Sequence, residues 1–299
     1  MPDQQQAAKI AFIGLGAMGQ PMAGHLVAAG FDVTGFDLFD EARQRFAASG
    51  GKTCGEIAAA LWNADIVITM LPNGKIVRDA LLDGENWRSL KKDCLVIDMS
   101  SSAPADTQRL AGALADKGVR LIDAPVSGGT KRAVSASLAI MVGGDDRDIE
   151  EAMPLLGAMG EKIFRTGPVG SGHAMKAINN YVSGATVIAT MEGTLLGETF
   201  GLKPETIVDI LNASSGRSNT SEVKMKQFVL SETFNSGFAL GLMAKDIRIA
   251  SDLADALGVT LPALTATAKM WEEAGRFFGR NADHTEIAKF IAARAKKTD

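Results

Sequence analysis

Short apolar runs alternate with longer stretches of mixed polarity from Lys9 to about Gly144. The centres of these runs are apolar on consecutive residues, as in Ile66-Val67-Ile68, which is typical of strands covered on both faces. Runs of this kind, separated by segments of helix length, are typical of a parallel sheet with crossover helices. We therefore predict strands over Lys9–Gly14, Asp32–Asp37, Ile66–Met70, Leu95–Asp98, Arg120–Ala124 and Leu138–Val142.

The pattern changes after Gly144. Glycines and a proline interrupt the segment Gly167–Gly172, and small and apolar residues then continue from His173 to about Phe200 without a proline. At 1.5 Å per residue this stretch predicts a helix of roughly 40 Å. The remaining residues show helical periodicity. We therefore predict an α/β fold, in which a doubly wound sheet domain over residues 1–168 is joined by a long interdomain helix to an all-helical domain over 169–299. The helical domain is expected to serve the substrate and oligomerisation.

Composition narrows the function classes. A chain of 299 residues with 46% hydrophobic and 22% charged residues is long enough for two domains and is ordinary for globular proteins. The formal net charge of −4 provides no basic field, so nucleic acid is not an expected partner. Cys54 and Cys94 form no metal-binding or disulfide pattern, and no apolar run is long enough for a membrane span. The N-terminal segment has no apolar signal-peptide core, so we predict a cytoplasmic location without membrane contact.

A glycine motif follows the first predicted strand. The sequence Gly14-Leu15-Gly16-Ala17-Met18-Gly19 matches G-x-G-x-x-G and opens a predicted helix over Gln20–Ala29. In this context the first glycine makes a tight turn, the second lets a pyrophosphate approach, and the third lets the helix pack on the strand. The alternative is a purely structural turn. The motif and its flanking elements favour a Rossmann-type dinucleotide site.

The next strand ends on an acidic residue, Asp37, 23 residues after Gly14. A carboxylate there accepts hydrogen bonds from the adenosine ribose but repels a 2′-phosphate. Leu38 follows Asp37, at a position where an NADP-binding site more often has an arginine. NAD is therefore the predicted cofactor, although Arg43 and Arg45 on the following helix leave NADP as an alternative.

Two further segments carry candidate chemistry. The segment Asp123–Gly129 ends a predicted strand with a serine and two glycines, whose N–H groups and hydroxyl could hold a carboxylate, or which simply form a turn. In the long predicted helix, Lys176 and Asn180 are four residues apart and share a face. Polar residues in an otherwise apolar helix need hydrogen-bonding partners, because burying them without partners costs free energy. The alternative for Lys176 is a surface lysine.

Four motifs together make the chain resemble the β-hydroxyacid dehydrogenase family, the group of 3-hydroxyisobutyrate dehydrogenase and tartronate semialdehyde reductase. They are Phe12–Gly19 with Met22-Ala23, the loop Asp123–Gly129, the segment Gly170–Asn180, and Lys245-Asp246. The motifs stand in the family's order and span most of the chain. The resemblance implies an oxidoreductase that moves a hydride between a nicotinamide and a small anionic β-hydroxy acid or semialdehyde.

The resemblance also implies residue roles. Lys176 would be the general acid/base, and Asn180 would help to hold the reacting hydroxyl. The substrate carboxylate would bind at Ser127, Gly128 and Gly129. Cofactor contacts would come from Leu71 and Pro72 with the adjacent Asn73, from Ser100 and Ser101 near the nicotinamide, and from Phe238, Lys245 and Asp246. The chain departs from the family at His25, where many members have Asn.

Several alternatives stay open. The polar loop Ser214–Asn219 is either a turn or a recognition segment in which Arg217 meets a second anionic or hydroxylated group of the substrate. An imine reductase or a redox-dead dinucleotide-binding module would use the same scaffold, but Lys176 and Asn180 favour a dehydrogenase. The histidines are too isolated for a metal site, so no metal is predicted. The apolar surface of the helical half predicts a homodimer or homotetramer.

Overall fold

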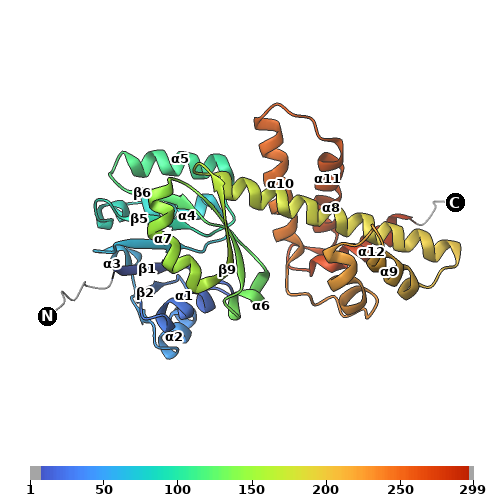
Figure 1. Cartoon of the computed structure of the whole chain (residues 1–299), viewed down its shortest axis with the longest axis horizontal. Helices are drawn as coiled ribbons and strands as arrows, with labels where there is room; N and C mark the ends of the chain where they lie inside the picture. Colours follow the sequence, from blue (N-terminus) through green and yellow to red (C-terminus); the bar gives the residue numbers. More distant parts are fainter. Residues whose placement is uncertain (1–7, 296–299) are drawn as a thin grey trace. The chain divides into compact units, whose positions relative to one another are not determined.

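The computed structural model describes residues 8–295. Within that range the chain divides into two compact units, the first ending at Lys176 and the second beginning at Ala177. The first is a Rossmann-type α/β unit and the second is helical (Figure 1), as the sequence predicts. None of the described helices is long and apolar enough to cross a membrane.

Nine strands of the described chain form one sheet in the first unit. They are β1 (Lys9–Ile13), β2 (Asp32–Phe36), β3 (Lys52–Thr53), β4 (Ile66–Thr69), β5 (Leu95–Asp98), β6 (Arg120–Asp123), β7 (Val126–Ser127), β8 (Leu138–Gly143) and β9 (Gly160–Gly167). Their order is β3-β2-β1-β4-β5-β6-β8-β7, with β9 paired to β8. The chain runs outward from β1 in one direction through β2 and in the other through β4. This reversal creates the switch point at which such sheets bind ligands, beyond the carboxyl ends of the strands.

Strand β8 departs from the parallel pattern. It runs antiparallel to β6 and β7, and β9 pairs with it in parallel. Only the short helix α6 (Gly129–Val134) and its flanking turns connect β7 to β8. A parallel crossover needs about a dozen residues or more, so this short connection returns the chain in the opposite direction.

Helices cover both faces of the sheet (Figure 1). Residues of α1 (Gly19–Ala28), α2 (Asp40–Ala48) and α7 (Asp146–Met159) form one core with the sheet. The other core contains residues of α3 (Ile57–Leu61), α4 (Gly74–Leu82) and α5 (Pro104–Ala115), beside the 3-10 helix η1 (Asn86–Ser89). In β1, Ile10 and Phe12 lie in the first core, whereas Ala11 and Ile13 lie in the second. This alternation explains why the strand is apolar on consecutive positions.

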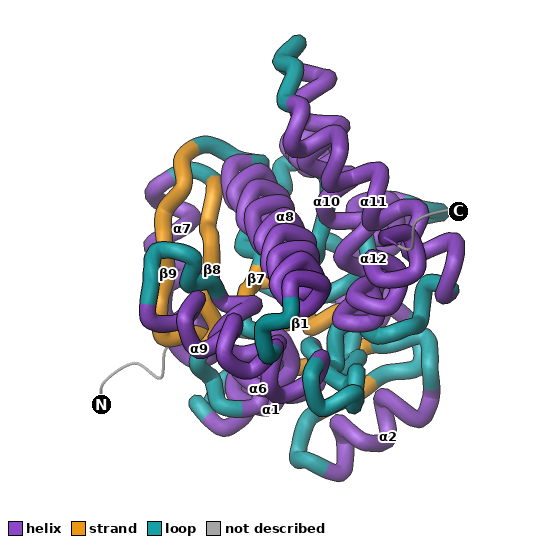
Figure 2. The backbone as a smooth tube through the Cα atoms, turned by 90° about the vertical axis from the view of Figure 1, so that its right-hand side faces the viewer, coloured by secondary structure: helices purple, strands orange, loops and turns teal. Residues whose placement is uncertain are grey.

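The second unit packs its helices around the long helix α8 (Ser171–Phe200), which is continuous in Figure 2. The other elements are α9 (Pro204–Ala213), the π-helix η2 (Thr220–Val229), α10 (Leu240–Ala256), α11 (Pro262–Phe278), the 3-10 helix η3 (His284–Glu286) and α12 (Ile287–Ala295). Trp271 is fully buried, and its indole N–H donates to the carbonyl of Gly184 at 3.2 Å. A Cβ on Gly184 would lie 2.4 Å from Ile247, so this glycine lets α10 and α11 approach α8.

The first turn of α8 belongs to the first unit and packs tightly against its sheet. A Cβ on Gly172 would lie 2.3 Å from the carbonyl oxygen of Met141 in β8 and 2.9 Å from the carboxylate of Asp123. Real Cβ atoms do not approach backbone that closely. The glycine at this position therefore serves the contact between helix and sheet.

We expect Gly172→Ala to lower the free energy of unfolding by about 1–3 kcal/mol, because the added methyl group overpacks this contact. Urea unfolding followed by circular dichroism measures the change. Gly193→Ala is the matched control on the same helix, since a Cβ there meets nothing within 4 Å. It should stabilise the helix by about 0.5–1 kcal/mol. Equal stability of the two variants would contradict the packing argument.

Candidate active site

The three motif glycines lie in different environments. Gly14 has a φ of +103°, and a Cβ there would lie 2.4 Å from the Met70 carbonyl oxygen. A Cβ on Gly19 would lie 1.9 Å from the Gly14 carbonyl oxygen, so it lets α1 pack on the turn. Gly16 is exposed and has open space around its Cβ position. The turn, the close packing and the open approach match the three roles of a dinucleotide-binding loop.

The carboxylate of Asp37 lies at the end of β2, beside this loop. One oxygen accepts the backbone N–H of Leu15 at 2.7 Å, and the other accepts that of Phe39 at 2.9 Å. Each oxygen keeps lone-pair capacity for a further donor. Arg43 donates to the Asp37 carbonyl and pairs with Asp40, whereas Arg45 contacts Gln20 at 3.3 Å. The carboxylate is therefore fixed in place and can accept from ribose hydroxyls.

The loops after β4 and β5 are joined to each other. The N–H of Leu71 donates to the hydroxyl of Ser100 at 2.9 Å, and the N–H of Ser100 donates to Asp98 at 3.0 Å. Pro72 is exposed and Ser101 is half-buried. The structure thus places these four predicted cofactor residues together at the carboxyl edge of the sheet. The neighbouring Asn73 is the N-cap of α4, because its side chain accepts the N–H of Ile76 at 3.0 Å.

The loop Ser127–Gly129 joins β7 to α6. Gly128 has a φ of +128° and Gly129 a φ of +65°, conformations that favour glycine. Both glycines are exposed and Ser127 is half-buried. The ring of His25 on α1 contacts the carbonyl oxygens of Ala133 and Val134 at 3.0 Å each, which attaches the end of α6 to α1. His25, the position at which the chain departs from the family, therefore makes a packing contact.

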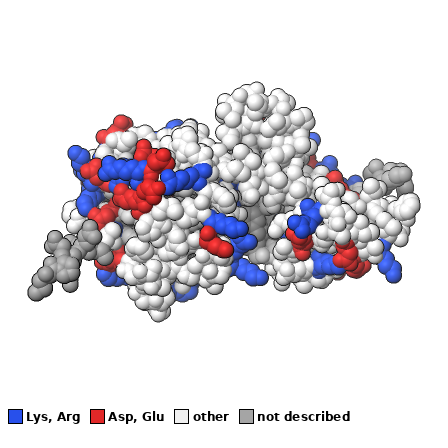
Figure 3. Space-filling model, in the orientation of Figure 1, with Lys and Arg blue, Asp and Glu red and all other residues white. Residues whose placement is uncertain are grey.

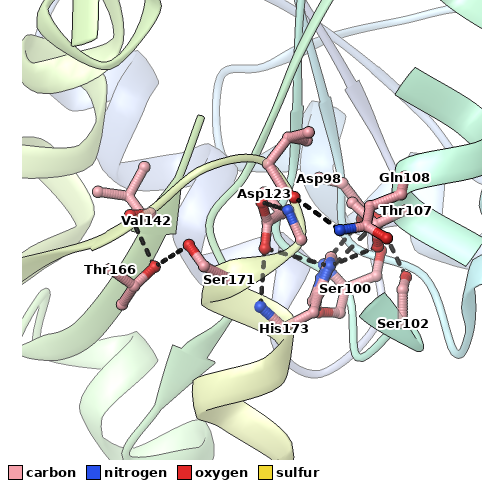
Figure 4. Close-up of polar contacts among 12 residues, drawn as sticks. Asp98, Ser100, Ser102, Thr107, Gln108, Asp123, Val142, Thr166, Ser171 and His173 are labelled. Atoms are coloured by element: carbon pink, nitrogen blue, oxygen red, sulfur yellow. Dashed lines mark hydrogen bonds and ion pairs between the residues drawn. The ribbon is translucent and has the colours of Figure 1, made fainter. Parts of the chain in front are cut away.

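A buried polar network holds the start of α8 (Figure 4). The carboxylate of Asp123 accepts the N–H of Gly170 at 2.6 Å and that of His173 at 2.7 Å. Burial raises the pKa of Asp123, and these N–H groups and His173 oppose the shift. The half-buried Lys176 follows His173 by three residues. The network therefore fixes the turn that carries the predicted acid/base.

Sequence reasoning missed this network, because it treated His173 as isolated. The structure pairs Asp98 with Asp123 across β5 and β6. Asp98 also accepts the hydroxyls of Thr69 and Ser102, each at 2.9 Å. A signal was available, since both neighbouring strands end in aspartate, and parallel neighbours bring their carboxyl ends to one edge.

The second unit contains a buried polar cluster around Asp246. The Asn180 amide, which is 6% exposed, donates to the Asp246 carboxylate at 2.6 Å and accepts from Asn179 at 3.1 Å. The ammonium of Lys245 lies 2.8 Å from the other Asp246 oxygen. Asp246 therefore contacts both of the other predicted site residues in this cluster, Asn180 and Lys245.

Phe238 is half-buried in a turn attached to η3. Its carbonyl accepts the N–H of His284 at 2.9 Å, and its ring stands edge-on to the imidazole at a centroid distance of 5.6 Å. Asp283 accepts the N–H of Gly237 at 3.0 Å. Burial lowers the pKa of His284 to about 4, and the charge of Lys224 adds to the shift, so this ring is neutral at pH 7. These contacts hold the turn that carries Phe238.

Arg217 lies in the exposed turn before η2, 3.5 Å from the carboxylate of Glu222. This contact is a surface ion pair, which contributes little to stability. The side chain is therefore available to an anionic ligand at small cost.

Charged side chains of both signs lie next to each other on the face drawn in Figure 3. In the first unit Arg120 pairs with Asp148 at 2.5 Å and with Glu151 at 2.7 Å, and Arg165 pairs with Asp146 at 3.1 Å. Local pairing of this kind leaves little long-range field. Within residues 8–295, no group of three or more His, Cys, Asp or Glu side chains could hold a metal ion.

Two family models match the chain in succession. The model described as the NAD-binding domain of 6-phosphogluconate dehydrogenase matches residues 9–167. The model described as the NAD-binding region of NADP-dependent 3-hydroxyisobutyrate dehydrogenase matches residues 170–291. The chain belongs to the β-hydroxyacid dehydrogenase family. It is accordingly an oxidoreductase that uses a nicotinamide cofactor and acts on a hydroxyl group, and its glycine loop and Asp37 fit that cofactor.

Individual relatives agree with this family. The chain is 39% identical to 2-(hydroxymethyl)glutarate dehydrogenase of Eubacterium barkeri over 92% of its own length and 91% of the relative's. The structure of Mycobacterium tuberculosis 3-hydroxyisobutyrate dehydrogenase with L-serine is similar at a TM-score of 0.88 and 33% identity, covering 95% of this chain and 99% of that one. An imine reductase of Myxococcus stipitatus is 15% identical with a TM-score of 0.66, covers 96% of this chain and 99% of that one, and shares only the fold.

Proposed function

We propose that this family member is an NAD-dependent dehydrogenase or reductase for a small 3-hydroxy acid or its semialdehyde, with Lys176 as the general acid/base. One observation carries the proposal. The turn of α8 that bears Lys176 is hydrogen-bonded, through His173, to the Ser100 loop at 3.0 Å. That loop lies at the carboxyl edge of the sheet, where the glycine loop also lies and where Rossmann folds bind the dinucleotide.

The cofactor supplies hydride transfer, and the chain's own residues hold and move the proton. When the alcohol is oxidised, neutral Lys176 accepts the hydroxyl proton, and when the carbonyl is reduced, the ammonium returns it. A lysine works as a base only if desolvation lowers its pKa toward the working pH. Asn180 lies one helical turn further on the same face of α8, from which its amide can orient the reacting oxygen.

We assign the remaining residue roles as the resemblance to the family implies them. We assign the substrate carboxylate to Ser127, Gly128 and Gly129, a loop of one half-buried serine and two exposed glycines that can offer N–H groups and a hydroxyl. Arg217 is assigned to a second polar or anionic group of the substrate. Contacts to the dinucleotide are assigned to the following residues: Gly14, Gly16, Ala17, Met18, Gly19, Asp37, Leu71, Pro72, Ser100, Ser101, Phe238, Lys245 and Asp246.

A substrate panel tests the reaction class. It contains 3-hydroxyisobutyrate, L-serine, 2-(hydroxymethyl)glutarate, threonate, tartronate semialdehyde and a sulfonated analogue. Absorbance at 340 nm follows the oxidation of each hydroxy acid with NAD or NADP, and the reduction of each aldehyde with NADH or NADPH. Pocket contacts separate such substrates by only about 1–3 kcal/mol per methylene, so one member should stand out by roughly tenfold or more. Absence of turnover with every member would overturn the proposal.

Lys176→Ala should lower kcat by about 10²–10⁴-fold, because the residue is assigned to proton transfer. NADH binding, measured by fluorescence titration, should stay almost intact, since the glycine loop and Asp37 hold the cofactor. Lys162→Ala removes an exposed lysine from β9 in the same unit and is the control. A Lys176→Ala enzyme that keeps more than about a tenth of the wild-type kcat would refute the mechanism.

We expect NAD to be preferred over NADP, because the Asp37 carboxylate repels a 2′-phosphate. Arg43, the nearest cation on α2, is already bonded to the Asp37 carbonyl and to Asp40. The double change Asp37→Ser with Leu38→Arg should move the ratio of kcat/KM values toward NADP. Steady-state kinetics in which the wild-type enzyme has the larger kcat/KM with NADP would disprove the assignment.

We also propose a homodimer or homotetramer. Large apolar side chains of the second unit are exposed, among them Leu196 at 72%, Phe200 at 85% and Phe277 at 64%. Such apolar surface is typical of protein–protein contact. Light scattering should therefore report a multiple of 31.4 kDa at micromolar concentration. A measured mass equal to that of one chain would exclude the assembly.

A cytoplasmic location is proposed as well. Cys54 and Cys94 are both free thiols, which suits a reducing compartment. Burial raises the pKa of Cys94 to about 12, so this thiol stays protonated and unreactive.

A further inference from the structure

His173 is a buried histidine whose two ring nitrogens both have partners. The side chain lies in the first turn of α8 and is 1% exposed. Its Nε2 lies 3.0 Å from the Ser100 carbonyl oxygen, and its Nδ1 lies 2.8 Å from the Thr107 hydroxyl (Figure 4). A carbonyl oxygen can only accept, so Nε2 carries a proton and donates it. The two contacts therefore fix the orientation of the ring.

Ser100, the residue that receives this bond, is held on three sides. Its N–H donates to Asp98 at 3.0 Å, its hydroxyl accepts the N–H of Leu71 at 2.9 Å, and its carbonyl accepts His173. The first two contacts come from β5 and from the loop after β4. Only the third comes from α8. His173 therefore couples the start of the helix to the predicted nicotinamide loop.

The position of His173 on the helix determines what this coupling does. His173 and Lys176 are three residues apart, so they are neighbours on the helix surface. The two N–H bonds to Asp123 fix the end of the helix at the sheet. The ring bonds to Ser100 and Thr107 fix the rotation of the helix about its own axis. Together they set the direction in which Lys176 leaves the backbone.

We propose that His173 is a positioning residue, which holds the general acid/base Lys176 in register with the nicotinamide-side loop through the Ser100 carbonyl. This inference rests on the proposed function. His173 is not itself the proton donor, because it is buried and both ring nitrogens are occupied. A misplacement of about 1 Å at a reacting group costs roughly 100-fold in rate, so a small rotation of this turn is enough to matter.

Four variants test the role with NAD and the best substrate of the panel. His173→Leu removes the donor to Ser100, and His173→Gln offers an amide N–H at similar reach. Thr107→Val removes the partner of Nδ1 and leaves the imidazole in place. Thr166→Val is the matched control, because it removes hydroxyl bonds to Ser171 at 2.7 Å and to the Val142 carbonyl at 3.0 Å from the same helix start. Neither of these hydroxyl bonds involves Ser100, so the control leaves the coupling intact.

His173→Leu should lower kcat by about ten- to hundredfold, with the dissociation constant of NADH changed less than about twofold. The solvent deuterium isotope effect on kcat should rise, because proton transfer becomes slower relative to the other steps. His173→Gln should recover most of the loss. Thr166→Val should keep kcat and the isotope effect of the wild type, even where its melting temperature falls.

The inference is overturned if folded His173→Leu has the kcat of Thr166→Val, or if its kcat falls while the isotope effect stays unchanged. Where His173→Leu does not fold, Thr107→Val decides: a rise in the isotope effect supports the role, and wild-type values overturn it. A failure of the proposed function gives other results, which distinguish it from a failure of this inference. In that case the wild-type enzyme turns over no substrate of the panel, or Lys176→Ala stays active.

Discussion

The buried carboxylate of Asp123 is the contact on which the active-site half of this protein depends. A carboxylate without exposure to water needs hydrogen-bond donors, and here the N–H groups of Gly170 and His173 supply one to each oxygen. Those donors belong to the start of α8, so the charge at the end of β6 decides where the helix begins. Gly172 permits the close approach to Met141 that this arrangement needs. The location of Lys176, three residues after His173 on the helix, therefore follows from an electrostatic requirement at the end of the sheet.

The same edge of the sheet carries the predicted cofactor contacts of the first unit. The order of strands reverses between β1 and β4, which opens the sheet edge at the glycine loop. Asp37 is fixed there by the Leu15 N–H, and the loops after β4 and β5 are fixed to each other through Ser100. A binding surface built in this way is preorganised, because its backbone groups are already held by hydrogen bonds. In the second unit the Asn180, Asp246 and Lys245 side chains are similarly held by one another.

Much of this arrangement was predictable from sequence. The apolar runs identified six strands, because a strand covered on both faces needs apolar side chains at successive positions, as Ile10, Ala11, Phe12 and Ile13 show. The start of α8 was also predictable within two residues, since glycines and a proline precede an uninterrupted helical stretch. The antiparallel direction of β8 relative to β6 and β7 was not predicted. Its direction depends on the length of the connection through α6, which hydrophobic periodicity does not report.

The sequence by itself determined the two kinds of unit, the dinucleotide loop and the family, because these depend on local signals: periodicity, glycine spacing and motif order. Only the tertiary structure decided which residues act together. Asp98, Asp123 and His173 are separated by tens of residues, and each has an ordinary local context. They meet because β5 and β6 are parallel neighbours and α8 starts across their ends. Hydrogen bonding depends on atoms being within about 3 Å of each other, and chain folding, not sequence distance, brings them there.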